Sequence, residues 1–243
     1  MDSTKKYFSV GDYDKTLHYA QLAEDLSVKQ NDKEGLRYAL YYKAGLYFDT
    51  QKLALADSVY QVVGDMSIEA RDTSLLIKVL NGQGNILALQ NDGSTALLKY
   101  YEALELARNG DPDTYYGIRS NMALAQLKNE QYEEALSNLL LTSEHFKKKG
   151  DKSALAIVNN NIGELYRENL NDFQMAKKHF YKAIALNHEV DSDYHLSKNF
   201  NNLGLCFERL NQKDSALYYL QKSLLLKKQL GDVGGTAICH YNI

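Results

Sequence analysis

The chain of 243 residues has little proline, tryptophan or cysteine. It holds one proline, Pro112, no tryptophan, and two cysteines, Cys206 and Cys239. Two cysteines are too few for a disulfide framework or a cysteine-rich metal site, and both lie on apolar faces where we expect packed thiols. They do not settle the compartment, so the localisation stays open between the cytoplasmic and the periplasmic side of a larger protein.

A charge excess and a long apolar run are also missing. The chain has 28 Lys and Arg against 31 Asp and Glu, which gives a formal net charge of −3. No basic field is therefore present to attract nucleic acid or an anionic membrane. There is no apolar run of about 18 residues and no charged start before an apolar core, which argues against a transmembrane helix and a signal peptide. We predict neither a nucleic-acid nor a membrane partner for this segment.

Catalytic and metal-binding signatures are absent from the sequence. Residues 82–84 read Gly-Gln-Gly but lack the third glycine and the strand of a dinucleotide loop, and there is no P-loop, His-Glu-x-x-His or Cys-x-x-Cys. The neighbouring Glu133 and Glu134 point about 100° apart on a helix and cannot form an acid–base pair. His179 is expected at a helix surface or a groove edge. The sequence therefore predicts no enzyme, no metal and no cofactor.

The sequence does contain an internal repeat. Residues 201–207 and 214–223 each place small or apolar side chains on one helical face, and a polar turn separates them. The small residue of the second helix recurs at spacings of 40, 40, 39, 41 and 40: Thr16, Ala56, Ala96, Ala135, Ala176 and Ala216. A constant period of roughly 20–50 residues signals a solenoid of helical hairpins.

The residues that carry this period resemble the tetratricopeptide repeat (TPR) family. That pattern has small residues at positions 8, 20 and 27, an aromatic or leucine at 11 and a large apolar residue at 24, matched here by Gly84, Ala96, Ala103, Leu87 and Tyr100. The resemblance covers essentially the whole chain and implies an all-α, TPR-like right-handed superhelical solenoid of antiparallel helical hairpins. The period exceeds the usual length of about 34, as in the long repeats of bacterial signalling proteins; HEAT-type repeats are the alternative.

We expect residues 1–243 to form a single TPR array. Its parts are a partial repeat at 1–30, repeats at about 33–70, 73–108, 111–149, 152–189 and 192–230, and a partial repeat at 233–243. Residues 1–8 would lie near the end of a first helix. Neither end shows the polar capping helix that solenoids need for solubility, so we expect an excerpt of a longer protein.

Local signals predict several helix boundaries. The expected caps are Asp72 with Thr73, Asp111 before Pro112, and Asp151 after the helix stop Gly150. In the third repeat we expect the turn at residues 91–94. Gly93 would there take a positive φ, and Ser94 would cap the second helix.

Asparagine recurs at positions of the first helices that line the concave groove of TPR arrays. The set is Asn81, Asn85, Asn121, Asn160, Asn161, Asn201 and Asn202. Asparagine is a mediocre interior helix residue, so the recurrence needs a reason. An amide has two donors and one acceptor oxygen, and a ladder of amides can bind the backbone of an extended peptide. The ladder is similar to those of kinesin light chain and bacterial peptide-pheromone receptors, which implies a peptide-binding role.

Other groove positions would shape specificity. Three tyrosines would form an aromatic wall, and three basic residues add positive charge: Tyr38, Tyr41, Tyr42, Lys78, Arg167 and Lys198. Nearby glutamates offset this charge, and the basic residues match a dicarboxylate clamp only loosely. As alternatives, the asparagines bond a neighbouring helix or water to hold the array together, and Tyr41 or Tyr42 packs against the second helix of its repeat.

The sequence favours a non-catalytic module that binds an extended peptide or protein segment in its concave groove. Two other functions stay open. The chain could be the sensory or regulatory input region of a larger bacterial signalling protein, such as a histidine kinase or a DNA-binding regulator. It could also be a structural array that forms homo-oligomers through its uncapped end repeats.

Overall fold

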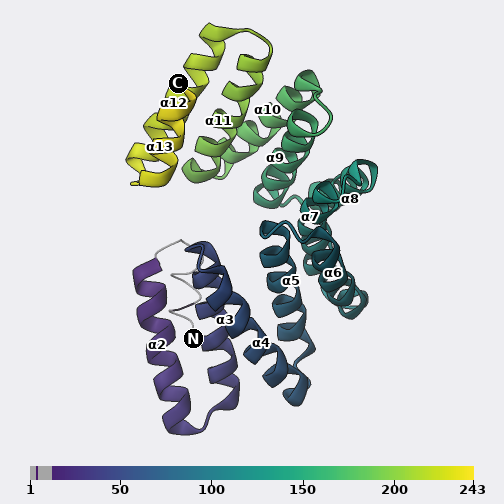
Figure 1. Ribbon diagram of the computed structural model, residues 1–243, viewed down its shortest axis with the longest axis vertical. Helices are drawn as coiled ribbons and strands as arrows, with labels where there is room; N and C mark the ends of the chain where they lie inside the picture. Colours follow the sequence, from purple (N-terminus) through teal and green to yellow (C-terminus); the bar gives the residue numbers. More distant parts are fainter. Residues whose placement is uncertain (1–3, 5–12) are drawn as a thin grey trace. The chain divides into compact units, whose positions relative to one another are not determined.

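The computed structural model describes residue 4 and residues 13–243. Within these residues the chain forms α-helices and no strand, and consecutive helices pair into antiparallel hairpins (Figure 1). The chain divides into two compact units, Met1–Asn129 and Glu130–Ile243. The predicted helix end at residues 1–8 lies, apart from Thr4, outside the described part of the chain.

The helix bounds follow the repeat. The first unit contains α2 (Tyr13–Gln30), α3 (Lys33–Asp49), α4 (Leu53–Ala70), α5 (Thr73–Leu89), α6 (Gly93–Ala107) and α7 (Pro112–Lys128). The second unit contains α8 (Tyr132–Lys149), α9 (Lys152–Glu168), α10 (Phe173–Glu189), α11 (Asp193–Arg209), α12 (Lys213–Gln229) and α13 (Val233–Asn242). In each unit every helix packs against the next, and α5 also touches α7, as α9 touches α11. The predicted all-α hairpin architecture is confirmed.

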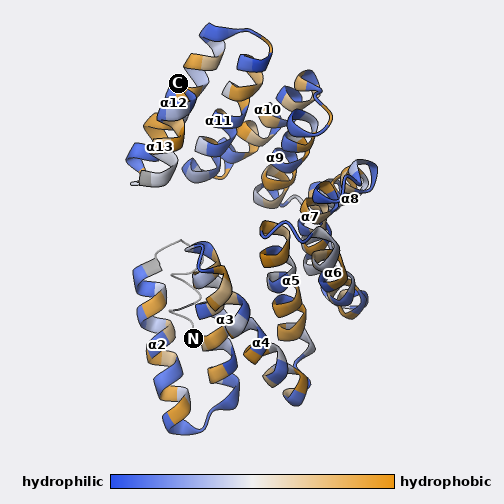
Figure 2. Ribbon diagram, in the orientation of Figure 1, coloured by the Kyte–Doolittle hydropathy of each residue, from blue (hydrophilic) through white to orange (hydrophobic). Residues whose placement is uncertain are grey.

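Each helix carries hydrophobic and hydrophilic residues along its length (Figure 2), and the buried face is built from pairs of one small and one large residue. In three hairpins a glycine of the first helix lies under a large side chain of the second. The pairs are Gly84 with Tyr100, Gly163 with Phe180, and Gly204 with Leu220. A Cβ on any of these glycines would come within 2.6–2.7 Å of its partner. The small residues of the repeat therefore set how closely the two helices approach.

Most turns are made by one residue in the left-handed region, followed by the cap of the next helix. The residues with positive φ are Asn31, Gln51, Arg71, Asn91, Glu130, Gly150, Asn171, Asp191, Asn211 and Gly231. The predicted stop at Gly150 is confirmed by its φ of 76°. The predicted caps Asp72 and Asp151 accept bonds from Leu75 N at 3.0 Å and Ala154 N at 2.9 Å. Asp111 likewise caps α7 just before Pro112.

The turn predicted inside the third repeat was wrong in detail. Asn91, not Gly93, takes the positive φ of 62°. Asp92 is the cap, and its carboxylate accepts a bond from Thr95 N at 3.1 Å, so Ser94 lies within α6. Gly93 is needed for a close approach instead, because a Cβ there would lie 2.5 Å from Asn129 Oδ1.

Candidate functional site

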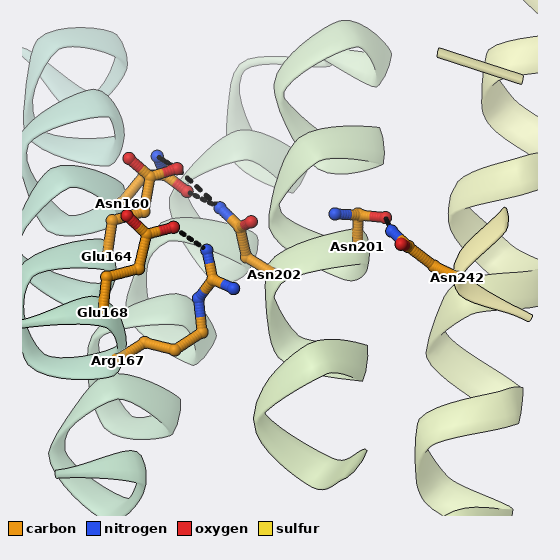
Figure 3. A network of polar contacts seen from close by, with 7 residues as sticks. All are labelled: Asn160, Glu164, Arg167, Glu168, Asn201, Asn202 and Asn242. Carbon is orange, nitrogen blue, oxygen red and sulfur yellow. Dashed lines mark hydrogen bonds and ion pairs between the residues drawn. The ribbon is translucent and has the colours of Figure 1, made fainter. Parts of the chain in front are cut away.

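In the second unit, the predicted asparagines join the first helices of successive repeats (Figure 3). Asn202 Nδ2 on α11 donates to Glu164 Oε1 at 2.7 Å and to Asn160 Oδ1 at 3.1 Å on α9. Asn160 Nδ2 donates to the same Glu164 oxygen at 3.1 Å. One carboxylate oxygen thus receives two amide donors, and these bonds fix the side-chain orientations between α9 and α11.

The network continues into the core. Asn199 Nδ2 donates to Asn160 Oδ1 at 2.8 Å, and Asn187 Nδ2 on α10 donates to Asn199 Oδ1 at 2.7 Å. Asn187 and Asn199 are each 1% exposed, and within the described part of the chain Asn187 Oδ1 has no hydrogen-bond partner. The sequence analysis did not identify either residue. A signal existed, because Asn199 stands at core spacing, three residues after Leu196 and four before Leu203.

Two further rungs have the same form. Asn242 Nδ2 on α13 donates to Asn201 Oδ1 on α11 at 3.0 Å, as Figure 3 shows. In the first unit, Asn121 Nδ2 on α7 donates to Asn81 Oδ1 on α5 at 3.0 Å. The bonded residues lie 40 or 41 positions apart in the sequence. The asparagine face is therefore a repeated bridge between first helices, the arrangement that the structural alternative for these residues predicts.

The rungs do not use all their hydrogen-bonding groups. Asn81, Asn121 and Asn201 are only half-buried. Among the described residues, Asn81 Nδ2, Asn121 Oδ1 and Asn201 Nδ2 bond no other group. Donors and an acceptor thus face solvent beside the bonded amides. Asn85 differs, because its Oδ1 accepts a bond from Tyr100 OH at 2.7 Å within the hairpin. Asn161 is half-buried on α9.

The predicted tyrosine wall divides between the core and its edge. Tyr41 packs on Tyr60 of α4, with ring centroids 6.0 Å apart, and on Tyr42 at 5.5 Å. Burial, with a smaller contribution from Tyr42, raises the pKa of Tyr41 to about 12. Tyr41 therefore packs against the second helix of its repeat, as the alternative interpretation has it. Tyr38 packs against the same buried apolar residues, which include Tyr60 and Val63 of α4. Tyr42 is half-buried.

The three predicted cations have different surroundings. Lys78 is exposed on α5. The Lys198 ammonium stands over the ring of Tyr194, one turn earlier on α11, at 4.3 Å from the centroid. Arg167 lies beside the ladder (Figure 3) and pairs with Glu168 at 2.6 Å, while its buried Nε has no hydrogen-bond partner among the described residues.

His179 is buried rather than at the surface or a groove edge, so that expectation was wrong. The ring is stacked on Tyr166 with centroids 5.8 Å apart, and Nδ1 lies 3.0 Å from Asn159 Oδ1. Desolvation, followed by the charges of Lys182 and Lys178, lowers the pKa of His179 to about 4. The ring is neutral at pH 7, and it carries its proton on Nδ1 because the facing Asn159 oxygen can only accept.

Replacing His179 with glutamine is expected to reduce the acid sensitivity of the fold. The pKa of His179 rises from about 4 in the folded chain to 6.5 in the unfolded one. Protonation then favours the unfolded state, and stability falls by roughly 1–3 kcal/mol as the pH drops through this window. Urea unfolding at about pH 7 and about pH 4 measures the loss, which should be smaller in His179→Gln. Equal losses in the two proteins would contradict this account.

No group of three His, Cys, Asp or Glu side chains is placed to hold a metal ion within residue 4 and residues 13–243. Over the same residues, no helix has both the length and the apolar character needed to cross a membrane.

Residues 154–229 match the model of the tetratricopeptide repeat family. They span α9 to α12, the hairpins that hold most of the ladder. Within this segment the chain consists of TPR-type repeats. No curated protein matches its sequence.

Solved TPR-like structures share the fold at low sequence identity. A Rap protein complexed with competence and sporulation factor is 15% identical with a TM-score of 0.75, over 98% of this chain and 70% of that one. BtubC (BKLC) from P. vanneervenii is 17% identical with a TM-score of 0.66, over 94% of this chain and 92% of that one. Aspartyl phosphate phosphatase F from Bacillus subtilis is 16% identical with a TM-score of 0.73, over 90% of this chain and 59% of that one. These likenesses confirm the all-α, TPR-like fold class.

Proposed function

We propose that this TPR module binds an extended peptide or protein segment along the first helices of its repeats. The observation that carries the proposal is the set of half-buried amides with unused groups, Asn81 Nδ2, Asn121 Oδ1 and Asn201 Nδ2. Each of these amides is also bonded to the amide of a neighbouring first helix. A ligand therefore meets donors and acceptors whose orientation is already fixed, which lowers the entropic cost of binding.

The spacing of the rungs suits a peptide backbone. Packed helices lie about 8–10 Å apart, and an extended chain advances about 3.3 Å per residue. One rung would then meet the ligand at about every third residue. Amides that bond the backbone give affinity with little sequence preference, because every residue except proline offers the same N–H and C=O groups. Selectivity would come from the side chains beside the ladder, such as Arg167, whose guanidinium pairs with Glu168.

The structural neighbours support the same direction. The Rap protein with a TM-score of 0.75 is complexed with competence and sporulation factor. That protein uses a fold similar to this one to hold a second molecule. An identity of 15% shows a shared fold and no more. The proposal that this chain binds a ligand therefore depends on its own amides.

The proposal is tested by selecting binders from a library of random extended peptides and measuring them against Asn81→Ala/Asn121→Ala/Asn201→Ala. Each neutral hydrogen bond contributes about 0.5–1.5 kcal/mol net, so a ligand that loses the two amides of the first unit, or the one amide of the second, should bind about 2- to 150-fold more weakly. Gln221→Ala, an exposed amide on α12, is the matched control and should bind as the wild type does. Circular dichroism checks that the helix content of all three proteins is equal. Equal binding by the triple variant, or no binding by the wild type, would remove the peptide role and leave the ladder as a structural device.

A further inference from the structure

The first unit has a recess on the other side of α5 from the ladder. We call it the outer groove: a hollow of about 480 Å³ between α4 and α6 with α5 as its floor. Its apolar lining includes Leu76, Val79 and Leu80 on α5, with Ile68 on α4 and Leu106 on α6. Ile68 and Leu106 are 61% and 41% exposed. Ile68 and Leu106 are thus large apolar side chains exposed to solvent at the edge of the apolar surface of α5.

The outer groove and the ladder lie on opposite faces of the same helix. At about 100° per residue, Leu76, Leu80 and Gln83 share one face of α5, and Lys78, Asn81 and Asn85 share the face about 180° away. The first set lines the outer groove. Asn81 on the second set bonds α7. A ligand in the outer groove would therefore not touch the amides of the ladder.

A glycine that the packing does not require opens the hollow. Gly64 lies in the interior of α4, where glycine costs about 0.5–1 kcal/mol relative to alanine. A Cβ at Gly64 would meet only Val79 Cγ1, at the ordinary contact distance of 3.5 Å. The equivalent positions of the following repeats carry Leu104, Ser143, Ile184 and Leu224. The other repeats place a side chain where this one leaves space.

The rim of the outer groove is acidic. The lining contains three carboxylates, Asp65 on α4 and Glu102 and Glu105 on α6. It contains one cationic side chain, Lys99. Lys99 pairs with Glu102 at 3.6 Å, and Arg108, outside the lining, pairs with Glu105 at 3.7 Å. Both pairs are largely exposed, and such pairs contribute little, so the carboxylates can exchange these partners for a ligand's cations. Glu102 and Glu105 are three residues apart and project from one side of α6.

We propose that the outer groove docks a basic amphipathic helical segment of a partner protein. Its apolar side chains, at spacings of three and four, enter the hollow opened by Gly64, and its lysines or arginines face Asp65, Glu102 and Glu105. An amphipathic helix laid into an apolar groove is a common mode of peptide recognition, and the acidic rim selects the basic sequence. This site is separate from the ladder and does not depend on the ladder binding a peptide.

The test selects peptides of about four helical turns, ~14 residues, from a random display library against the wild-type chain, with Gly64→Leu for counter-selection. Leucine at position 64 reproduces the residue of the next repeat and fills the hollow. The selected peptides should be rich in lysine and arginine with apolar residues at helical spacing. A representative peptide should bind Gly64→Leu at least about tenfold more weakly than wild type, a loss of about 1.4 kcal/mol.

Two more proteins make the result specific. Glu102→Gln/Glu105→Gln keeps the shape of the groove and removes two charges, so the peptide should bind it several-fold more weakly, and the difference should shrink in salt. Asn81→Ala/Asn121→Ala should bind the same peptide as wild type does, which separates this site from the ladder. The proposal is overturned if Gly64→Leu binds the selected peptides unchanged, if acidic or neutral peptides are selected equally, or if no peptide is recovered.

Discussion

Replacing Phe180 with alanine is expected to lower the free energy of unfolding by about 3–5 kcal/mol. The Phe180 ring is fully buried, and it lies over the backbone of Gly163, so that a Cβ there would come within 2.6 Å of Phe180 Cε1. Neighbouring helices cannot close the space, because their separation is set along the whole hairpin. Urea unfolding followed by far-UV circular dichroism measures the loss.

Gly163→Ala tests whether the glycine and the ring act as a pair. In the wild type the added methyl group overpacks the contact and should cost about 1–3 kcal/mol. In Phe180→Ala the space is free, so the same change should be neutral or stabilise by up to about 1 kcal/mol through helix propensity. Gly117→Ala is the control, since no atom lies within 4 Å of its Cβ position, and it should stabilise both backgrounds equally. An identical cost of Gly163→Ala in both backgrounds would contradict the pairing.

This pairing explains why the hairpins could be predicted from the sequence. A glycine or alanine must face a large side chain at a fixed distance along the chain, because that contact sets how closely the two helices pack. The contact therefore recurs in the sequence of three hairpins, as Gly84 with Tyr100, Gly163 with Phe180 and Gly204 with Leu220. Helix starts were predictable for a similar reason, since an aspartate such as Asp72 caps its helix by a bond to an N–H only three residues away.

The errors arose where a distant residue decides the local structure. Gly93 lies in a turn-like sequence, but glycine is needed there because Asn129, the C-cap residue of α7, lies against it. Asp92 and Ser94 are both good capping residues, and nothing within the turn ranks one above the other. His179 stands between Lys178 and Phe180 in the sequence, and these neighbours do not decide whether its ring is buried. Its burial depends on Tyr166 and Asn159, which belong to the other helix of the hairpin.

The candidate site shows the same division. The repeat positions predicted that the asparagines share one face, because a period of about 40 residues puts equivalent positions of successive first helices side by side. Whether an amide bonds its neighbour or solvent depends on distances that the period does not contain. Asn121 and Asn81 proved to be bonded at 3.0 Å. Asn187 and Asn199 were missed because they stand at core positions, where a search of groove positions does not look.

Replacing Asn199 with leucine is expected to cost about 2–4 kcal/mol in unfolding free energy, although the two side chains have similar size. Asn199 joins Asn187 on α10 to Asn160 on α9. Leucine would leave Asn187 Nδ2 without its partner, and Asn187 Oδ1 has none already. A buried polar group without a partner costs about 1–3 kcal/mol. Urea unfolding of the wild type and the variant measures the effect.

The double variant Asn187→Leu/Asn199→Leu should then be more stable than Asn199→Leu alone. Replacing both members of a buried hydrogen-bonded pair by apolar groups removes the unsatisfied amide together with its partner. We expect a recovery of about 1–2 kcal/mol, within the range of coupling energies for residues in contact. In both variants Asn160 still accepts the bond from Asn202. The two variants therefore differ only at the buried amides and not in the half-buried part of the ladder. If the double variant is as unstable as the sum of its two single variants, the buried amides do not act as a pair.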